Sequence, residues 1–513
     1  MSRICLAASA LVLSAGAAFA QEDVNKALID LLVKKGVLSQ QDVSNLQAEL
    51  AANQATQQTT TTTTTSSAAS APEAAPATAV PVVVDTTKGP LAFRVGNVSF
   101  APFGFLDFTA VYRNEATGSA IGTSFNSIPY SNGSTGQLSE TKFSAQNSRL
   151  GVRIDSEVND TKATGYLETD FLGNAPTNLG VSSNSATMRL RNYFIDLRNG
   201  PWEFLAGQDW SMFTPNRKGI SPYPSDVFYT NDMDTNYQAG LTWARQPQVR
   251  FLYHPTDEFV MGISLENPDQ YVGSAVVLPA AFSATEVDQG TATSQPNPFP
   301  DVIGKMAYDT KAINGLNWHF ELTGMVRSFK VNTFSSTINT DDTKEGEGVQ
   351  GAVDLELIKG LNLIATGFYS YGGGRYINGL GPDFVITPPG PGGDYGIGLV
   401  KSESGIIGLE FAAAPTDTIS AYFSEAEFGD RWDKVGSTYV GYGYPGSANS
   451  NNKTITEWTL DDTYTFWKSS TYGALQLIGQ VSYVNRTPWY VAPGTPSSAN
   501  TTMVFLDLRY VLP

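Results

Sequence analysis

Apolar and charged side chains alternate along several consecutive segments between residues 144 and 213, and this alternation restricts the possible folds more than any other feature. In Arg149–Asp155, positions 150, 152 and 154 are leucine, valine and isoleucine, whereas positions 149, 153 and 155 are charged. This pattern predicts β-strands with one apolar and one polar face. No other part of the chain supplies a layer to cover the apolar face. Hydrocarbon outside and water inside would satisfy both faces, which predicts a transmembrane β-barrel.

About sixteen segments with β-like patterns follow one another from Ser99 to the end of the chain. Each has roughly the ten residues that a tilted strand needs to cross a bilayer. Tight turns such as Asn159-Asp160 alternate with long loops such as 115–143, as in outer-membrane barrels with short periplasmic turns. We therefore predict an all-β transmembrane barrel of about 16 antiparallel strands with a short N-terminal α-helical segment. The predicted strands are 99–114, 144–158, 160–173, 187–199, 201–213, 238–253, 258–268, 300–309, 316–331, 348–359, 361–373, 402–414, 417–430, 453–467, 474–489 and 501–512.

Residues 1–20 predict a secretory signal peptide, with Arg3, an apolar stretch and the cleavage site Ala18-Phe19-Ala20. Cys5 is the only cysteine and is expected to leave with this peptide, so we predict no disulfide and no thiolate metal ligand. The formal net charge of -17 argues against a nucleic-acid partner, because phosphate binding needs clustered Lys and Arg. No later run of apolar residues is long enough to predict a transmembrane helix.

Residues 21–55 predict a helical stub of two short helices that could associate as a trimeric coiled coil in the periplasm. A small monomeric hairpin fits the same pattern, because so few heptads are marginal alone. Residues 56–90 form a low-complexity Thr/Ala/Pro linker, and residues 91–513 form the predicted barrel. The expected oligomerisation residues are Leu28, Leu31, Leu32, Val43, Leu46 and Leu50.

Two predicted hairpin turns set the register of neighbouring strands, provided that each turn contains two residues. Both registers place arginine on the same wall as Glu, Asp or Gln, consistent with a water-filled interior. An arginine that faced lipid at mid-bilayer would cost roughly 2–4 kcal/mol. The turn Asn159-Asp160 predicts Arg153 opposite Tyr166 and Arg149 opposite Asp170; the turn Asn199-Gly200 predicts Arg191 opposite Gln208 and Arg189 opposite Trp210.

Several short motifs resemble the DcaP-like trimeric porins. They are Ser148-Arg149-Leu150-Gly151, Glu168-Thr169-Asp170-Phe171, Arg189-Leu190-Arg191, Leu205-Ala206-Gly207-Gln208-Asp209-Trp210-Ser211 and Arg245-Gln246-Pro247-Gln248-Val249-Arg250. The resemblance covers about residues 99–270. It implies a sixteen-stranded homotrimeric channel in a Gram-negative outer membrane, in contact with lipid and lipopolysaccharide, that passes small and often carboxylated solutes. The chain departs from such barrels at its end, Tyr510-Val511-Leu512-Pro513, which is not aromatic, so its assembly signal is shifted or different.

The arginines of the first predicted strands share the inward parity, and two interpretations follow. They could form a basic ladder that attracts anions, since guanidinium groups match carboxylate geometry. Alternatively, neighbouring carboxylates neutralise each arginine and stiffen the wall. The loop 214–237, with Arg217 and Lys218, is predicted to fold inward and narrow the channel, although an exposed cap fits equally. The predicted channel-lining residues are Arg149, Arg153, Tyr166, Glu168, Asp170, Arg189, Arg191, Gln208, Trp210, Arg217, Lys218 and Arg250.

The sequence thus favours a porin for passive diffusion of small hydrophilic solutes, with a preference for organic anions. Rival interpretations are a sugar-specific channel, a protein that ties the outer membrane to peptidoglycan through its N-terminal segment, and an outer-membrane hydrolase that uses His319. The inward parity of His319 with Glu321 argues against the hydrolase. We predict no catalytic residue, no metal site and no cofactor.

Overall fold

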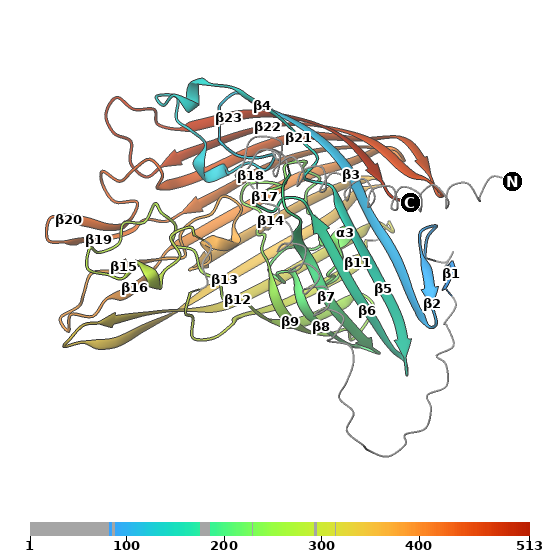
Figure 1. The fold of residues 1–513 in the computed structure, drawn as a ribbon, viewed down its shortest axis with the longest axis horizontal. Helices are drawn as coiled ribbons and strands as arrows, with labels where there is room; N and C mark the ends of the chain where they lie inside the picture. The colour runs from blue at the N-terminus through green and yellow to red at the C-terminus, as the bar shows by residue number, and fades with distance from the viewer. Residues whose placement is uncertain (1–81, 85–87, 175–184, 228, 292–294, 313) are drawn as a thin grey trace, which may run out of the picture. The chain divides into compact units, whose positions relative to one another are not determined.

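The computed structural model describes residues 82–84, 88–174, 185–227, 229–291, 295–312 and 314–513. They contain sixteen antiparallel strands that close into a barrel through pairing of the last strand with the first (Figure 1). The predicted signal peptide, and the stub with Leu28, Leu31, Leu32, Val43, Leu46 and Leu50, lie outside the described residues. No helix in the described part of the chain is both long and apolar enough to cross a membrane.

All sixteen predicted strands are present, most with ends within a few residues of the prediction. The barrel strands are β3 (Val98–Arg113), β5 (Arg149–Val158), β6 (Thr161–Asp170), β7 (Arg189–Asn199), β8 (Trp202–Trp210), β9 (Arg245–Tyr253), β10 (Phe259–Glu266), β11 (Asp301–Lys311), β12 (Asn317–Phe334), β13 (Asn339–Ile358), β14 (Leu361–Tyr371), β17 (Lys401–Ala414), β18 (Asp417–Phe428), β21 (Asn452–Ser469), β22 (Gly473–Pro488) and β23 (Ala499–Val511).

Short elements that the sequence did not predict lie outside the barrel strands. Two small hairpins form within the long loops, and an additional pair of strands precedes β3. These elements are β1 (Val82–Val84), β2 (Phe93–Val95), η1 (Phe125–Ser127), η2 (Thr135–Gln137), α3 (Pro224–Val227), η3 (Ala284–Glu286), η4 (Gly374–Tyr376), β15 (Phe384–Thr387), β16 (Gly396–Leu399), β19 (Arg431–Val435) and β20 (Thr438–Tyr442).

The predicted strand 144–158 is interrupted. The short strand β4 (Glu140–Ser144) pairs with the second half of β3, and β5 pairs with the first half. Between them, the amide of Asn147 donates to Asp107 Oδ2 at 3.1 Å, and the Ser148 hydroxyl accepts from the Asp107 N–H at 3.0 Å. These side-chain bonds replace the missing ladder bonds and keep the wall continuous.

The faces of the strands are divided as predicted. Leu150 is 41% exposed on the outside, whereas Arg149 is only 8% exposed and faces the interior. The same division holds around the barrel: Phe108, Ile195 and Leu506 are exposed outside, and most polar side chains of the strands are buried inside. The apolar outer face suits hydrocarbon, and the charged inner face requires water or ion pairs.

One of the two predicted hairpin registers is confirmed and the other is wrong. Arg153 lies opposite Tyr166 and Arg149 lies opposite Asp170, and both turn residues, Asn159 and Asp160, have positive φ, as a type I′ turn requires.

The second hairpin turns at Gly200-Pro201 instead of Asn199-Gly200. Asn199 therefore faces Trp202, and Tyr193, not Arg191, faces Gln208; the predicted Arg189–Trp210 pair does not form. Gly200 at positive φ followed by proline suits a type II′ turn.

A β-bulge in β7 was also not predicted. Arg191 and Asn192 together occupy the space opposite Glu168 on β6, and both side chains are buried in the interior. A bulge places two consecutive residues opposite one, which shifts the parity of the strand. Arg189 and Arg191, at odd positions before the bulge, therefore point inward, and so do Phe194 and Asp196, at even positions after it.

We expect Leu506→Arg to lower the free energy of unfolding in phospholipid vesicles by about 2–4 kcal/mol, because Leu506 is an exposed residue in the middle of the outer face. Tyr472→Arg is the depth control, since Tyr472 is exposed beside the short turn before β22, where the cost falls to about 0–1 kcal/mol. Equal losses in urea titrations of the two variants would contradict the assigned outer face.

Candidate functional site

The long segment between β8 and β9, residues 211–244, folds into the barrel, and we call it the inner loop. Its side chains and backbone bond to the opposite wall. The Arg217 guanidinium pairs with Glu410 of β17 at 2.6 Å, and the Tyr229 hydroxyl donates to the Ala365 carbonyl of β14 at 2.6 Å. The Asn231 N–H donates to the Tyr422 hydroxyl of β18 at 2.9 Å. The prediction that this loop folds inward, and does not cap the outside, is therefore confirmed.

A buried charged cluster holds the first part of the inner loop. His319 Nδ1 lies 2.8 Å from Asp309, and its Nε2 lies 3.2 Å from Glu321. The same two carboxylates accept the backbone N–H groups of Gly219 at 2.9 Å and Asn216 at 3.0 Å. The histidine thus orients the acceptors that fix the loop. Lys305 adds to the same cluster through an ion pair with Glu321 at 2.9 Å.

The second part of the inner loop lies over an acidic stretch of wall. Asn231 bonds to β18, and the Met233 N–H donates to Gln480 of β22, so Asp232 between them lies over β21. Burial raises the pKa of Asp232 well above its usual range, and the nearby Glu457 and Asp461 of β21 raise it further. Asp232 is 6% exposed, so its surroundings favour the protonated form of its carboxyl group.

The arginines predicted to form a basic ladder are largely neutralised. Arg191 pairs with Glu168 and lies 2.7 Å from Asp170, which also binds Arg189 at 2.7 Å. The remaining pairs are Arg153 with Asp155 at 2.9 Å and Arg250 with Asp209 at 2.9 Å. For these four arginines, the contacts match the second interpretation, in which neighbouring carboxylates neutralise each arginine and the ion pairs stiffen the wall. A ladder of uncompensated charges is not what the structure contains.

Arg149 also contacts the inner loop: its guanidinium donates to the Tyr237 hydroxyl at 3.2 Å and lies 5.3 Å from the ring centre of Phe105. Arg245 was not among the predicted lining residues. It lies 5.0 Å above the ring of Trp210 and forms no ion pair with any described residue. The sequence offered one signal for Arg245, namely its place at the start of the motif that ends in Arg250.

Three other predicted lining residues, Tyr166, Gln208 and Lys218, differ in whether they face a cavity. Tyr166 is buried beneath the inner loop, stacked 5.2 Å from Phe194, and its hydroxyl donates to Glu168. Gln208 donates its amide to the Arg191 carbonyl at 2.7 Å, but it lies opposite Tyr193 and Pro247, on the parity of the exposed Ile195 and not on that of the buried Phe194. Lys218 is exposed toward a cavity.

Two cavities remain between the inner loop and the wall. The larger, of about 490 Å³, lies on the short-turn side and is lined by charged side chains that include Arg153, Lys218 and Asp196. The smaller, of about 240 Å³, is lined by Arg149 and Asp232. Arg509, which the sequence analysis missed, also lines the smaller cavity and pairs with Asp107 at 2.7 Å. Both cavities are polar spaces in which a small hydrophilic solute would meet fixed charges.

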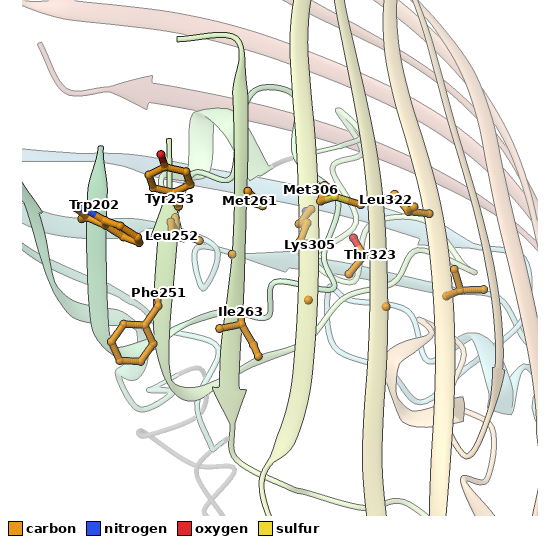
Figure 2. Close-up of a pocket in the computed structure, with 14 residues that line it drawn as sticks. Trp202, Phe251, Leu252, Tyr253, Met261, Ile263, Lys305, Met306, Leu322 and Thr323 are labelled. Atoms are coloured by element: carbon orange, nitrogen blue, oxygen red, sulfur yellow. The ribbon is translucent and has the colours of Figure 1, made fainter. Parts of the chain in front are cut away.

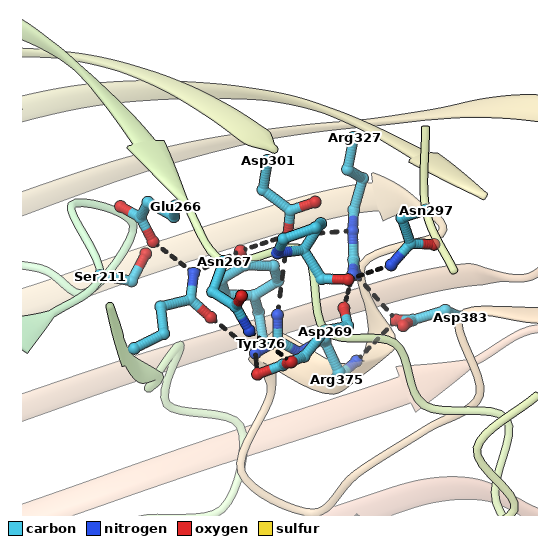
Figure 3. A network of polar contacts seen from close by, with 12 residues as sticks. Ser211, Glu266, Asn267, Asp269, Asn297, Asp301, Arg327, Arg375, Tyr376 and Asp383 are labelled. Atoms are coloured by element: carbon cyan, nitrogen blue, oxygen red, sulfur yellow. Dashed lines mark hydrogen bonds and ion pairs between the residues drawn. The ribbon is translucent and has the colours of Figure 1, made fainter. Parts of the chain in front are cut away.

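Buried ion pairs also fix the loop between β14 and β17 (Figure 3). Arg327 of β12 lies 3.1 Å from Asp383 of this loop and 3.4 Å from Asp301. The hydroxyl of Tyr376, also in this loop, donates to Asp301 at 2.8 Å. Charged side chains at 0% exposure must be paired to be tolerated, so this network anchors the loop to the barrel.

Within the described residues, no three or more His, Cys, Asp or Glu side chains are grouped so that they could hold a metal ion. Both histidines lie beside carboxylates: His319 as above, and His254 Nε2 at 2.9 Å from Glu203.

Comparison with family models found no match, and no relative was found among curated proteins. Among solved structures, the chain is similar to the outer-membrane channel DcaP of Acinetobacter baumannii, with a TM-score of 0.57 and 18% identity over 82% of this chain and 99% of that one. The anion-selective porin from Comamonas acidovorans has a TM-score of 0.44 at 12% identity, over 81% and 100% of the two chains. OmpT of Vibrio cholerae has a TM-score of 0.43 at 12% identity, over 82% and 98%. The similarity to DcaP confirms the expected barrel fold.

We expect His319→Ala to loosen the first part of the inner loop. The bonds to charged acceptors that it orients contribute about 1.5–3 kcal/mol each, so amide exchange at Asn216 and Gly219 should accelerate roughly 10- to 100-fold. His254→Ala is the matched control, because its partner Glu203 lies in β8 outside this cluster. Unchanged exchange at Asn216 and Gly219 would show that the histidine does not hold the loop.

The raised pKa of Asp232 makes the seating of the second part of the loop depend on pH. Because the seated state favours the protonated acid, its stability is greatest below the ordinary Asp pKa of about 3.9 and falls as the pH rises toward the raised value. Protection of the 231–233 amides, corrected for intrinsic exchange, should therefore decrease with pH in the wild type. It should stay nearly constant in Asp232→Asn; a parallel decrease in this variant would refute the assignment.

Proposed function

We propose that this protein is an outer-membrane porin that passes small hydrophilic solutes by passive diffusion. One observation supports this most: the closed barrel has an apolar outer face, and an inward-folded loop leaves polar, charged cavities along the inner wall. Fixed charges in such cavities lower the entry barrier for a solute while keeping its binding weak enough for release. Catalysis is not part of the proposal.

We further propose a preference for organic anions, although most of the arginines are paired. The smaller cavity is lined by Arg149 and Arg509 together with Asp232 and Asp234, and Arg509 pairs with Asp107 at 2.7 Å. Nearby, Arg245 stacks on Trp210 without an ion pair among the described residues. The proposed preference rests on Arg245, in a protein whose overall charge is negative.

The other parts of the sequence-based prediction remain proposals. They are a homotrimer in a Gram-negative outer membrane, contact with lipopolysaccharide, and a periplasmic N-terminal segment that could bind peptidoglycan. A sugar-specific channel is less favoured, because the aromatic group of Tyr166 and Phe194 is buried beneath the inner loop and does not form an accessible track.

The reversal potential of the purified protein in a planar bilayer under a KCl gradient tests the proposal. We expect the wild type to favour chloride, and Arg149→Gln combined with Arg245→Gln to shift the potential toward that of a cation-selective pore. Arg431→Gln combined with Lys434→Gln is the charge-matched control, since both residues are exposed on β19 of the β19–β20 hairpin. An absence of conductance would refute the porin, and wild-type selectivity for potassium would refute the anion preference.

A further inference from the structure

The outer wall of the barrel contains an apolar groove across β9–β13, which we call the wall groove (Figure 2). It consists of two adjoining hollows of about 570 Å³ and 530 Å³ that share Gly304, Gly324 and Val349. Its banks are the exposed outward side chains of Phe251, Met261, Ile263, Met306 and Leu322.

Two adjacent glycines create the floor of the wall groove. Gly304 and Gly324 face each other in the β11–β12 ladder, and a Cβ atom at either position would have no atom within 4 Å. Glycine weakens a strand interior, and the neighbouring outward positions carry large side chains such as Met306 and Leu322. The space above the glycines is therefore open to another molecule.

We propose that the wall groove binds an acyl chain of a phospholipid from the periplasmic leaflet. The groove is continuous with the apolar outer face that the barrel presents to hydrocarbon, and its banks offer methionines, whose flexible thioethers adapt to a mobile chain. The site is distinct from the channel and rests only on the barrel lying in a bilayer.

The two ends of the groove determine which lipid fits. At one end, Trp202 lies 4.5 Å from Tyr253, beside the short turns, where paired aromatic rings suit the headgroup level of the membrane. The other hollow is bordered by Glu347, whose carboxylate would repel the phosphates of lipopolysaccharide. Lys305 also borders the groove, but its ammonium is buried on the inner side in the ion pair with Glu321. An aromatic end beside the short turns and an acidic residue at the other hollow together favour an acyl chain that enters the groove from the periplasmic side.

Native mass spectrometry tests the proposal. The full mature protein is extracted from the outer membrane in mild detergent, and the lipid that stays bound to it is measured. We expect phospholipid bound to the wild type, and a several-fold loss of it in Gly304→Leu/Gly324→Leu, whose added Cβ atoms have open space and whose side chains extend into the groove. Gly479→Leu is the matched control, because Gly479 lies on β22 between the outward Leu477 and Val481 and also has open space at its Cβ. This control should retain the lipid.

Three outcomes would overturn the proposal: equal phospholipid retention in the double variant and the control, retention of lipopolysaccharide in place of phospholipid, or a change of oligomeric state in the double variant without a change in lipid. The last result would assign the groove to a second copy of the chain. Conductance of the same preparations separates this proposal from the porin function, since the double variant should conduct like the wild type.

Discussion

Hydrocarbon around the barrel determines the direction of every strand's side chains, because an arginine facing lipid at mid-depth costs roughly 2–4 kcal/mol. The charged residues are thereby gathered on the inner wall, where space is limited and many carboxylates and guanidinium groups become neighbours. Arg191, Glu168 and Asp170 illustrate the result, since they form a buried network in which each charge has an opposite partner. Such pairs stiffen the wall, and removing one partner would leave a costly buried charge.

The inner wall also explains why the long loops can enter the barrel. A loop that leaves water must find partners for its backbone groups, and the carboxylates and amides of the strands provide them. Glu321 receives the Asn216 N–H, and Glu457 receives the Ala239 N–H at 2.7 Å. The side chains that make the barrel polar inside are thus the ones that position the inner loop, and the loop in turn defines the cavities of the proposed channel.

Much of the fold could be predicted from the sequence, because the period of two along each strand is a local property. Turn chemistry was less informative: Asn159-Asp160 gave the correct register, but Asn199-Gly200 did not, since Gly200-Pro201 forms the turn. The bulge at Arg191-Asn192 then reversed the parity of the rest of β7, so that Gln208, predicted to face inward with Arg191, lies opposite Tyr193 on the outward parity.

The candidate site was harder to predict, because its contacts join residues far apart in the chain. The pairing of Arg217 with Glu410, or the position of Asp232 over β21, has no local signature. The bulge at Arg191-Asn192 and the stacking of Arg245 on Trp210 likewise depend on three-dimensional packing. For this reason the sequence identified the arginines but did not establish which contacts each of them makes.

The most direct test of the account uses single cysteines on β5, since Cys5 is the only native cysteine and belongs to the predicted signal peptide. Leu150 is 41% exposed and the Arg153 side chain is 39% exposed, so both positions are accessible but on opposite faces of β5. In intact membranes, a charged, membrane-impermeant thiol reagent should modify Arg153→Cys and leave Leu150→Cys unmodified. Modification of Leu150→Cys alone would contradict the account, because it would place water on the outer face and bury the arginine face.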